Sequence, residues 1–514
     1  MAEKSQINNK RIASNTMMLY FRMLFMMLIG LYTSRVILDK LGEVDYGVYN
    51  VVAGFVTTFS VVSGAMTSAT QRFISFEIGK GKDGDVKSIF STMIIIHLFL
   101  AGIIIVLAET FGLWFLNNKM NFPIDRYVAV NWVFQFSLIS FLINVISVPY
   151  NAALIAYEKM SAFAWMTILD SILKLLICYL ITTTSIDKLV VYAFLMAVIA
   201  IIDRILYGVY CSRKISDCKN NWSYNKTYVK EVFSYVSWNL IGSLSIVGRE
   251  HGVNVVLNIF FGATVNAARG VAYQVLSKVQ GFVSNFQLAL NPQIIKSYSS
   301  GEYEAMYKLV FRGAKFSYLL MMVFVIPIYI ELPTILNIWL VDVPDYTVVF
   351  TRLVLLTSML ASLSNPLIIS VHASGVVRDY QLVVGGISLL TLPIVCVAFY
   401  LKADAYYAMI IGLVMEFICH LARLIMLGRI MDFPVYSFLL NVTLRVFIIN
   451  VLAFLPPLFL SCQIDIPIVR FVVVCVSSFI CSIVFSFYLG FQKTEQMLIK
   501  EKLTSKVLSK FSRK

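Results

Sequence analysis

The sequence predicts an all-α protein that crosses a membrane many times, and three observations lead to this fold class. Of its 514 residues, 59% are hydrophobic and only 14% are charged, whereas a soluble chain carries about 25% charged residues. Apolar runs of about 20 residues, the length of a helix that spans a bilayer, follow one another along the chain. Because the linkers between them are short, we expect about 14 transmembrane helices and no soluble domain.

The first six apolar runs are expected to form an N-terminal lobe. They lie at residues 12–37, 46–71, 88–116, 127–156, 160–182 and 187–211. The first run follows a short basic start and could suggest a signal peptide, but it is too long for the apolar part of one and no small-residue cleavage site follows it. We therefore expect a retained helix and assign residues 1–211 to this lobe.

The second half of the chain repeats this arrangement and adds two helices. Its eight runs lie at residues 229–260, 264–290, 305–330, 346–371, 378–401, 404–428, 437–461 and 467–490. The basic segment 212–228 is interpreted as a cytoplasmic linker, and residues 229–430 as a second six-helix lobe. Residues 431–490 hold two accessory helices, and residues 491–514 form a basic cytoplasmic tail that contacts anionic lipid headgroups or stays solvated.

The distribution of Lys and Arg predicts the orientation in the membrane. The chain holds 42 Lys and Arg against 28 Asp and Glu, a net charge of +14. With the N-terminus inside, most basic residues, including those of "KGKDGDVK" and "SRKISDCKNN", fall on the inner side. The outer side holds Lys40, Lys119, Arg126, Lys188 and Lys402. Because cytoplasmic loops are rich in Lys and Arg, we expect both termini in the cytoplasm and see no need for a nucleic-acid partner.

An internal repeat relates the two lobes. A shift of 220 residues places Gly42 on Gly262 and Gly81 on Gly301, and a helix, a short outer turn, a helix and a basic inner loop follow in the same order. Six helices, an even number, separate the copies, so both copies have the same orientation. We expect two pseudo-symmetric parallel six-helix lobes around a central cavity, as in transporters that work by alternating access.

Several motifs of other protein classes are absent from the sequence. It has no GxxxxGK[ST] loop, so ATP is not expected to be its direct energy source. None of its eight cysteines forms a CxxC pair, and its four histidines are scattered without ligand spacing, so neither a disulfide framework nor a metal site is indicated. We expect a transporter without a cofactor rather than an enzyme.

Once the cations that pair on their own helix or lie near a helix end are set aside, four cations inside apolar runs remain: Arg22, Arg249, Arg269 and Lys278. A cation at the centre of a membrane helix costs about 2.5–3.5 kcal/mol, so such side chains usually face a wet cavity or a partner. Arg249 has Glu250 beside it, but the other three have no acid three or four residues away. Guanidinium groups bind phosphate bidentately, so we expect a cavity for an anion; packing against an acid on another helix is the alternative.

Other charges within the spans have partners on the same helix. Lys174 lies four residues after Asp170, a favourable spacing on one helix face. Arg423 follows Glu416 by seven residues. We interpret both pairs as structural.

Three acids within the spans, Asp203, Glu250 and Glu416, could bind a proton or a sodium ion that drives transport, or could serve the structure. Arg35 lies near the outer end of the first span and can reach Asp39. We expect Arg35 to serve an outer gate or to pair with Asp39.

Two stretches carry a resemblance to a known family. "RVILDKLGEVDYGVYNVVAGFVTTFSVV" resembles the junction between the first two helices of bacterial polysaccharide flippases, where a turn of form LGxxxxGxYN opens the second helix. The match rests on Gly42, Gly47, Tyr49 and Asn50. "FGATVNAARGVAYQV" is similar to the corresponding turn of the second lobe. Its matching residues are Gly262, Ala267 and Ala268.

This resemblance places the chain in the superfamily of multidrug, oligosaccharidyl-lipid and polysaccharide exporters. It implies a flippase that moves an undecaprenyl-diphosphate-linked oligosaccharide across the bacterial inner membrane for surface polysaccharides such as the O-antigen of lipopolysaccharide. It also implies a polysaccharide polymerase and glycosyltransferases as possible partners. Cavity arginines on the first helices of each lobe are typical of such flippases, and Arg22, Arg249 and Arg269 are the candidates here.

Two other functions compete with the flippase. A cation-coupled multidrug exporter of the same superfamily would bind cationic drugs and needs carboxylates in its cavity. The first span contains no acid, and the two spans that open the second lobe contain only Glu250 beyond Glu231 at their start. A membrane polysaccharide polymerase or glycosyltransferase usually needs a large outer loop or a clustered acid pair. The longest outer segment, 331–345, is short, and after Glu331 at its start its acids are Asp342 and Asp345.

Overall fold

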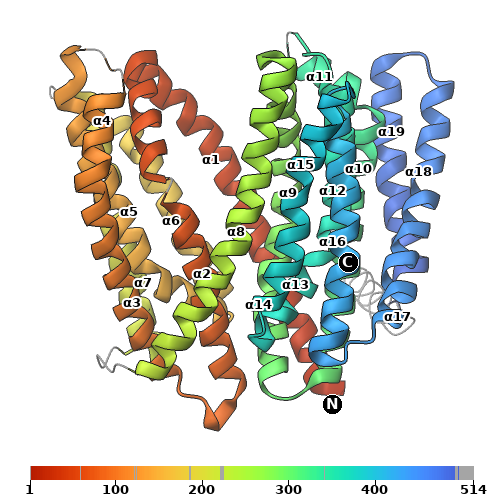
Figure 1. The fold of residues 1–514 in the computed structure, drawn as a ribbon, viewed down its shortest axis with the longest axis horizontal. Coiled ribbons are helices and arrows are strands. Elements are labelled where there is room, and N and C mark those ends of the chain that lie inside the picture. The colour runs from red at the N-terminus through yellow and green to blue at the C-terminus, as the bar shows by residue number, and fades with distance from the viewer. Residues whose placement is uncertain are drawn as a thin grey trace, which may run out of the picture. The chain divides into compact units, whose positions relative to one another are not determined.

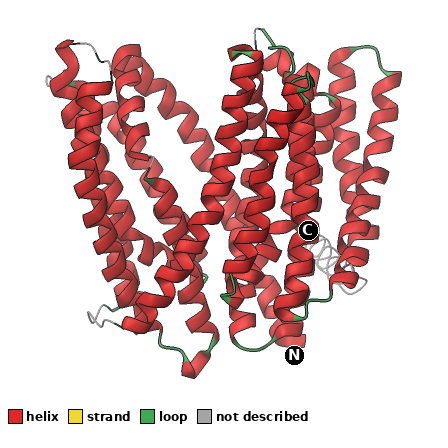
Figure 2. Ribbon diagram, viewed as in Figure 1, coloured by secondary structure: helices red, strands yellow, loops and turns green. Residues whose placement is uncertain are grey.

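The computed structural model describes residues 2–57, 59–120, 122, 124–184, 187–219, 225–340, 342–491 and 496. Within these residues all regular secondary structure is helical (Figures 1 and 2). The prediction of an all-α polytopic fold is therefore confirmed.

Nine α-helices make up the first part of the described chain. They are α1 (Ala2–Thr57), α2 (Ser60–Gly79), α3 (Val86–Leu107), α4 (Leu113–Lys119), α5 (Tyr127–Ala156), α6 (Met160–Leu180), α7 (Lys188–Lys214), α8 (Lys226–Phe261) and α9 (Ala263–Ser299). The π-helical segment η2 (Ala108–Gly112) joins α3 to α4. α3, η2 and α4 together therefore form one long membrane helix.

The rest of the described chain is equally helical. Its helices are α10 (Tyr303–Ile330), α11 (Leu332–Trp339), α12 (Thr347–Ser362), α13 (Ser364–Ser374), α14 (Arg378–Tyr380), α15 (Gly386–Tyr400), α16 (Tyr407–Met431), α17 (Val435–Phe438), α18 (Arg445–Gln463) and α19 (Pro467–Phe485). Three further π-helical segments are η5 (Gln381–Gly385), η6 (Leu439–Leu444) and η7 (Ser486–Gly490). Each of them continues or completes a membrane helix.

The predicted spans lie on these helices. Nine helical segments in the described part are long and apolar enough to cross a membrane, and the pair α12–α13, bent by 41°, makes a tenth. The other four predicted spans fall on α1, α2, α8 and α9. These helices are more polar, and the four intramembrane cations of the sequence analysis lie on three of them.

The chain divides into two compact units, each described by itself below. Unit 1 comprises Met1–Ser243 and Leu288–Met306, and unit 2 comprises Leu244–Gln287 and Tyr307–Lys514. The division falls inside α8 and α9, so each of these helices contributes to both units.

Each unit has its own apolar core. In unit 1, Val52, Ile104, Val133 and Phe134 bring α1, α3 and α5 together and are almost fully buried. In unit 2, a second cluster joins α8, α9, α12, α15 and α16. Its largest members include Leu257, Phe350 and Phe399. These cores fix the helices that carry the polar side chains considered below.

The glycines that define the sequence repeat share one backbone conformation. Gly42 and Gly262 have φ of 80° and 82°, and Gly81 and Gly301 have φ of 67° and 73°. Positive φ is accessible to glycine at little cost but strained for other residues. The two glycines of each pair in the 220-residue repeat therefore have nearly the same φ.

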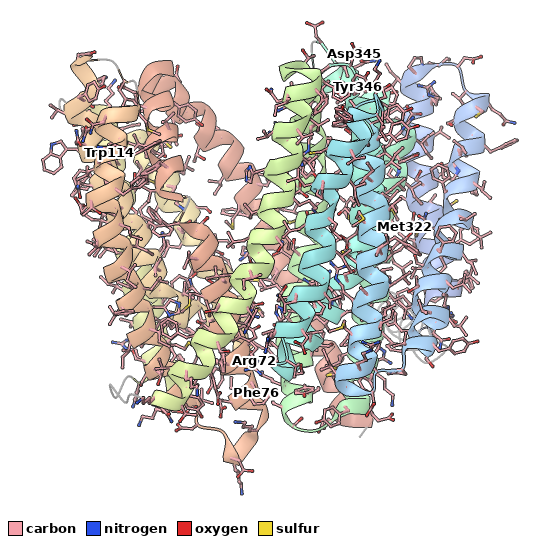
Figure 3. The ribbon with its side chains drawn as sticks, viewed as in Figure 1. Arg72, Phe76, Trp114, Met322, Asp345 and Tyr346 are labelled. Carbon is pink, nitrogen blue, oxygen red and sulfur yellow. The ribbon has the colours of Figure 1, made fainter. Side chains whose placement is uncertain are left out.

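One end of α2 buries a cation that the sequence places just after the predicted span 46–71. Arg72 is only 8% exposed. Its guanidinium lies over the rings of Phe73, Phe76 and Tyr235, at 4.5, 4.8 and 5.4 Å from their centroids, and Figure 3 shows Arg72 beside Phe76. Because aromatic faces attract cations, these rings replace part of the hydration that the guanidinium of an exposed arginine would have.

Candidate functional site

The α8–α9 hairpin gathers a cluster of charges in unit 2. Arg269 Nη2 donates to Glu250 Oε2 at 2.6 Å, and the Tyr273 hydroxyl donates to the same oxygen at 2.7 Å. Arg249 Nη2 donates to Glu250 Oε1 at 3.0 Å, and Arg269 Nη1 to Asn254 Oδ1 at 3.3 Å. Glu250 therefore binds two arginines and one tyrosine.

The geometry of the hairpin explains this convergence. The chain turns at Gly262, so α8 and α9 run antiparallel. Glu250 and Asn254 are one helical turn apart on α8, and Arg269 and Tyr273 are one turn apart on α9. Residues four apart share a helix face, so two facing pairs of polar residues meet.

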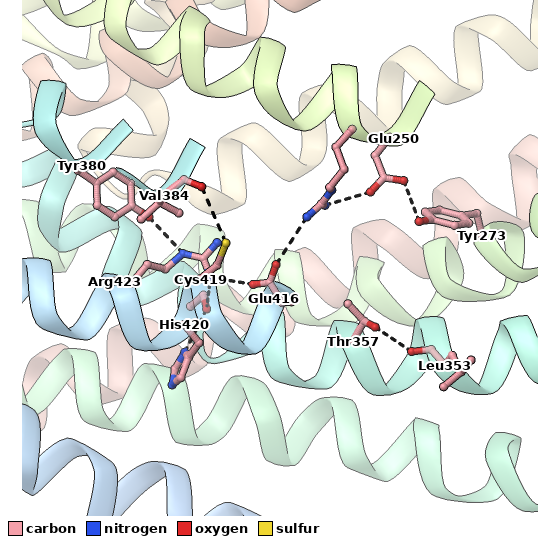
Figure 4. Close-up of polar contacts among 12 residues, drawn as sticks. Glu250, Tyr273, Leu353, Thr357, Tyr380, Val384, Glu416, Cys419, His420 and Arg423 are labelled. Atoms are coloured by element: carbon pink, nitrogen blue, oxygen red, sulfur yellow. Dashed lines mark hydrogen bonds and ion pairs between the residues drawn. The ribbon is translucent and has the colours of Figure 1, made fainter. Parts of the chain in front are cut away.

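A second acid extends this cluster to α16. Glu416 Oε1 accepts a hydrogen bond from Arg423 Nη1 at 2.7 Å, and Glu416 Oε2 lies 3.9 Å from Arg249 Nη1. Arg423 also donates to the hydroxyls of Ser364, at 2.9 Å, and Tyr380, at 3.2 Å. Figure 4 shows the connected contacts from Tyr273 through Glu250 and Glu416 to Arg423.

These charges border a cavity of about 330 Å³ in unit 2. Arg249, Glu250, Arg269 and Glu416 line it, with apolar side chains from α12 and α16 and with Gln280. Arg269 is 9% exposed and Glu416 is 6% exposed. The cavity thus offers charged groups that are shielded from bulk water, where electrostatic interactions are stronger than at an exposed surface.

The predicted cavity cations have different surroundings. Arg249 and Arg269 lie in the cluster just described, where each contacts Glu250, so the partner of Arg269 comes from another helix. Lys278 is exposed on α9. Arg22 is half-buried on α1 in unit 1, and its guanidinium lies 4.9 Å from the centroid of the Phe163 ring of α6.

Unit 1 holds a separate polar cavity of about 190 Å³. Asp170, Lys174 and Asp203 line it, together with Tyr49 and Asn144. Lys174 Nζ donates to Asp170 Oδ2 at 2.8 Å, which is the same-helix pair expected from the sequence. Asp203 on α7 lines the same cavity as Asp170 and Lys174 of α6.

The residues predicted for the outer gate and the first turn are described only in part. The side chains of Arg35 and Asn50 and the surroundings of Gly47 lie outside the described residues. Asp39 forms an exposed ion pair with Lys40, with Nζ and Oδ2 2.8 Å apart. Gly42 interrupts α1 with φ 80° and ψ 166°, and Tyr49 packs edge-on against Tyr192 of α7 with ring centroids 4.7 Å apart.

Sequence reasoning missed several members of these sites. Tyr273, Asn254 and Ser364 are uncharged, so a search for intramembrane charges passes over them. A signal exists for two of them, because Asn254 lies four residues after Glu250 and Tyr273 four residues after Arg269. Ser364 has no such signal, since its contact with Arg423 joins residues 59 positions apart.

Both sites carry groups that can bind charged ligands. Among the described residues, no group of three or more His, Cys, Asp or Glu is placed to hold a metal ion. The unit 2 cluster can bind an anion through its arginines or a proton or cation through its carboxylates. The unit 1 cavity offers two adjacent carboxyls and one ammonium group, which suit proton or cation binding.

Comparison with known proteins identifies the fold. No family model matches the chain, and no curated protein matches it. Among the solved structures, a multidrug resistance MATE family transporter of the MOP superfamily in an outward-facing conformation is 12% identical, with a TM-score of 0.71 over 84% of this chain and 96% of its own. The MATE transporter ClbM in complex with Rb⁺ is 14% identical, with a TM-score of 0.66 over 80% of this chain and 94% of its own.

A third structure of the same fold comes from Pyrococcus furiosus. It is a MOP superfamily transporter described by a reverse polarity of its binding pocket that suggests a different function. It is 12% identical, with a TM-score of 0.63 over 84% of this chain and 96% of its own. The protein therefore has the multi-pass membrane fold of MATE transporters of the MOP superfamily.

Proposed function

We propose that this protein is a flippase that moves an undecaprenyl-diphosphate-linked oligosaccharide from the inner to the outer leaflet of a bacterial inner membrane by alternating access. The observation that carries the proposal is the charge balance of the unit 2 cluster. Three arginines, Arg249, Arg269 and Arg423, meet two glutamates, Glu250 and Glu416. The cluster keeps an excess of positive charge at membrane depth, and Arg22 adds another cation in unit 1.

An excess of positive charge suits a substrate that brings negative charge of its own. A diphosphate cannot cross hydrocarbon unaided, because burial of an unpaired charge is prohibitive. Arginine side chains bind phosphate oxygens bidentately and stay charged when partly buried. A lipid-linked diphosphate would compete with Glu250 and Glu416 for the arginines. The substrate and the carboxylates would therefore bind the same arginines in turn.

This exchange also suggests how transport could be driven. A carboxylate that loses its arginine to the substrate gains affinity for a proton or a cation. Glu250 and Glu416 are the candidates for this coupling in unit 2. Asp203, beside Asp170 and Lys174, is the candidate in unit 1. In the cell we propose that both termini face the cytoplasm, and that a polysaccharide polymerase uses the translocated product.

The flippase proposal is tested by complementation of a strain that lacks its own flippase for lipid-linked oligosaccharide. Arg22→Ala should reduce the surface polysaccharide at least about tenfold, since a lost hydrogen bond to a charged group is worth about 1.5–3 kcal/mol. Arg22→Lys should keep part of the activity, because the charge remains and only the bidentate geometry is lost. The matched control is Arg213→Ala, an exposed arginine at the end of α7, which should complement fully.

A second candidate function is a cation-coupled multidrug exporter. The solved structures of similar fold include multidrug transporters, and two carboxylates line the unit 2 cavity. The two functions make opposite predictions in one strain that lacks both its drug pumps and its flippase. Drug resistance and ethidium efflux without restored polysaccharide would replace the flippase proposal, and so would full complementation by a well-expressed Arg22→Ala variant.

A further inference from the structure

One predicted span of unit 2, 346–371, is broken near its middle. α12 ends at Ser362 and α13 begins at Ser364, and the two helices are bent by 41° to each other. Among the described helix pairs that could together cross a membrane, this is the one pair with a bend of that size. The break at Leu363 therefore needs an explanation of its own.

Pro366, in the first turn of α13, weakens the helix at this point. Proline has no N–H, so the carbonyl of Ser362, four residues earlier, loses the donor that a continuous helix would supply. Yet Pro149, Pro292 and Pro393 each lie inside one continuous α-helix. A proline alone therefore does not account for the break, and contacts from other helices must contribute.

A side chain of α9 replaces the missing donor. Gln287 Nε2 donates to the carbonyl oxygen of Ser362 at 3.3 Å and to Ser317 Oγ of α10 at 3.1 Å. All three residues are buried, so bulk water does not compete for this carbonyl. Neighbouring helices commonly satisfy the groups that a proline frees within a membrane, and here they hold the end of α12.

Arg423 of α16 holds the other side of the break. Its Nη1 donates to Ser364 Oγ at 2.9 Å and to Glu416 Oε1 at 2.7 Å, and its Nε donates to the Tyr380 hydroxyl at 3.2 Å. Glu416 lines the 330 Å³ cavity of unit 2, and Figure 4 shows Arg423 between Tyr380 and Glu416. One nitrogen of a buried arginine thus joins the first residue of α13 to a carboxylate of the cavity.

We infer that Leu363 is the centre of a hinge, and that the charge of Glu416 sets its angle through Arg423. Glu416 is faced by Arg423 of its own helix and by Arg249 of α8, whose Nη1 lies 3.9 Å from Glu416 Oε2. When Glu416 is neutralised by a bound cation, the other hydrogen-bond partners of Arg423 named above are all neutral. An uncompensated buried charge is costly, so the guanidinium turns away and Ser364 moves with it.

The length of α13 sets the size of the motion. Its 11 residues span about 17 Å at 1.5 Å per residue. Straightening the 41° bend would move the far end of α13 sideways by about 12 Å, from the same helix length. A hinge of this kind turns a local change of charge into a displacement of a whole helix. The motion lies inside unit 2 and would serve either candidate function, so its test does not depend on complementation.

The distance between two spin labels tests the hinge in the full-length protein in lipid nanodiscs. The labels replace Val376, 47% exposed after α13, and Tyr436, 76% exposed on α17; they enter as unnatural amino acids because the chain has eight cysteines. Pro366→Ala gives Ser362 a helical donor, so the mean distance should change by at least about 3 Å, a quarter of full straightening. The control is Pro393→Ala, in the continuous α15, which should leave the distance unchanged. The same distance in Pro366→Ala as in the unsubstituted protein would refute a movable break.

Removal of the charge tests the coupling without any substrate. Glu416→Gln should shift the mean distance by at least about 3 Å, on the same scale of helix length, whereas Asp465→Asn, the loss of an exposed charge in unit 2, should not. Ser364→Ala breaks the contact between Arg423 and α13, so it should broaden the distance distribution, and a further Glu416→Gln should then add no shift. If Glu416→Gln does not fold, Ser364→Ala alone decides. Unchanged distances in the folded Glu416→Gln or Ser364→Ala variants would overturn the coupling.

Discussion

The ion pair between Glu158 and Lys296 offers a direct measure of how strongly α9 is held to unit 1. Lys296 Nζ donates to Glu158 Oε1 at 2.5 Å. The Glu158 side chain is 1% exposed and the Lys296 side chain is 19% exposed. The two residues are 138 positions apart, and the contact joins the short α5–α6 connection to the end of α9. The substitution that tests it is Lys296→Met, which keeps the length of the side chain and removes its charge.

The burial of this pair sets the size of the expected effect. Removal of one partner from a buried ion pair leaves an uncompensated charge and costs about 3–5 kcal/mol of folding free energy. Because only 1% of the Glu158 side chain is exposed, water cannot replace the lost ammonium group. The double variant Glu158→Gln with Lys296→Met removes both charges, so it should be more stable than Lys296→Met alone.

The assay is the free energy of unfolding of purified variants in mixed detergent micelles, with helix content as the readout. The double-mutant cycle should give a coupling energy within about 0.5–3 kcal/mol. Lys40→Met is the matched control, since the Lys40–Asp39 pair has exposures of 41% and 67% and should contribute about 0.2–1 kcal/mol. Equal effects of Lys296→Met and Lys40→Met, or a coupling near zero, would refute the reasoning.

Three further predictions follow from single features. Gly42→Ala should destabilise the protein by about 1–3 kcal/mol, because φ 80° with ψ 166° is essentially a glycine conformation. The control is Gly30→Ala, which lies in a regular helix with open space around it and should not lower the melting temperature in the same thermal scan. Equal losses of stability in the two variants would contradict this. Arg470→Leu should lower the melting temperature because it leaves Glu331, 2% exposed, without its arginine. An additional Glu331→Gln should restore the melting temperature, and no restoration would show that the pair is unimportant. Asp203→Asn should weaken the dependence of transport on the proton or sodium gradient while the protein still folds, and unchanged gradient dependence in reconstituted vesicles would exclude Asp203 from coupling.

Composition and local spacing were sufficient to predict much of this fold. Apolar runs predict membrane helices because each helix satisfies its own backbone hydrogen bonds, whatever its neighbours are. The Asp170–Lys174 and Glu416–Arg423 pairs could also be predicted, because both members of each pair lie on the same helix. The glycine repeat was also visible, because a backbone with positive φ restricts the residue type at its own position.

The partners of the remaining buried charges were decided by the tertiary structure alone. Arg269 lacks an acid at helical spacing, yet it binds Glu250 of α8. Lys296 binds a glutamate 138 positions away. Each of these features depends on which helices become neighbours. The packing of whole apolar faces decides which helices become neighbours, and the spacing of residues along one helix does not predict it.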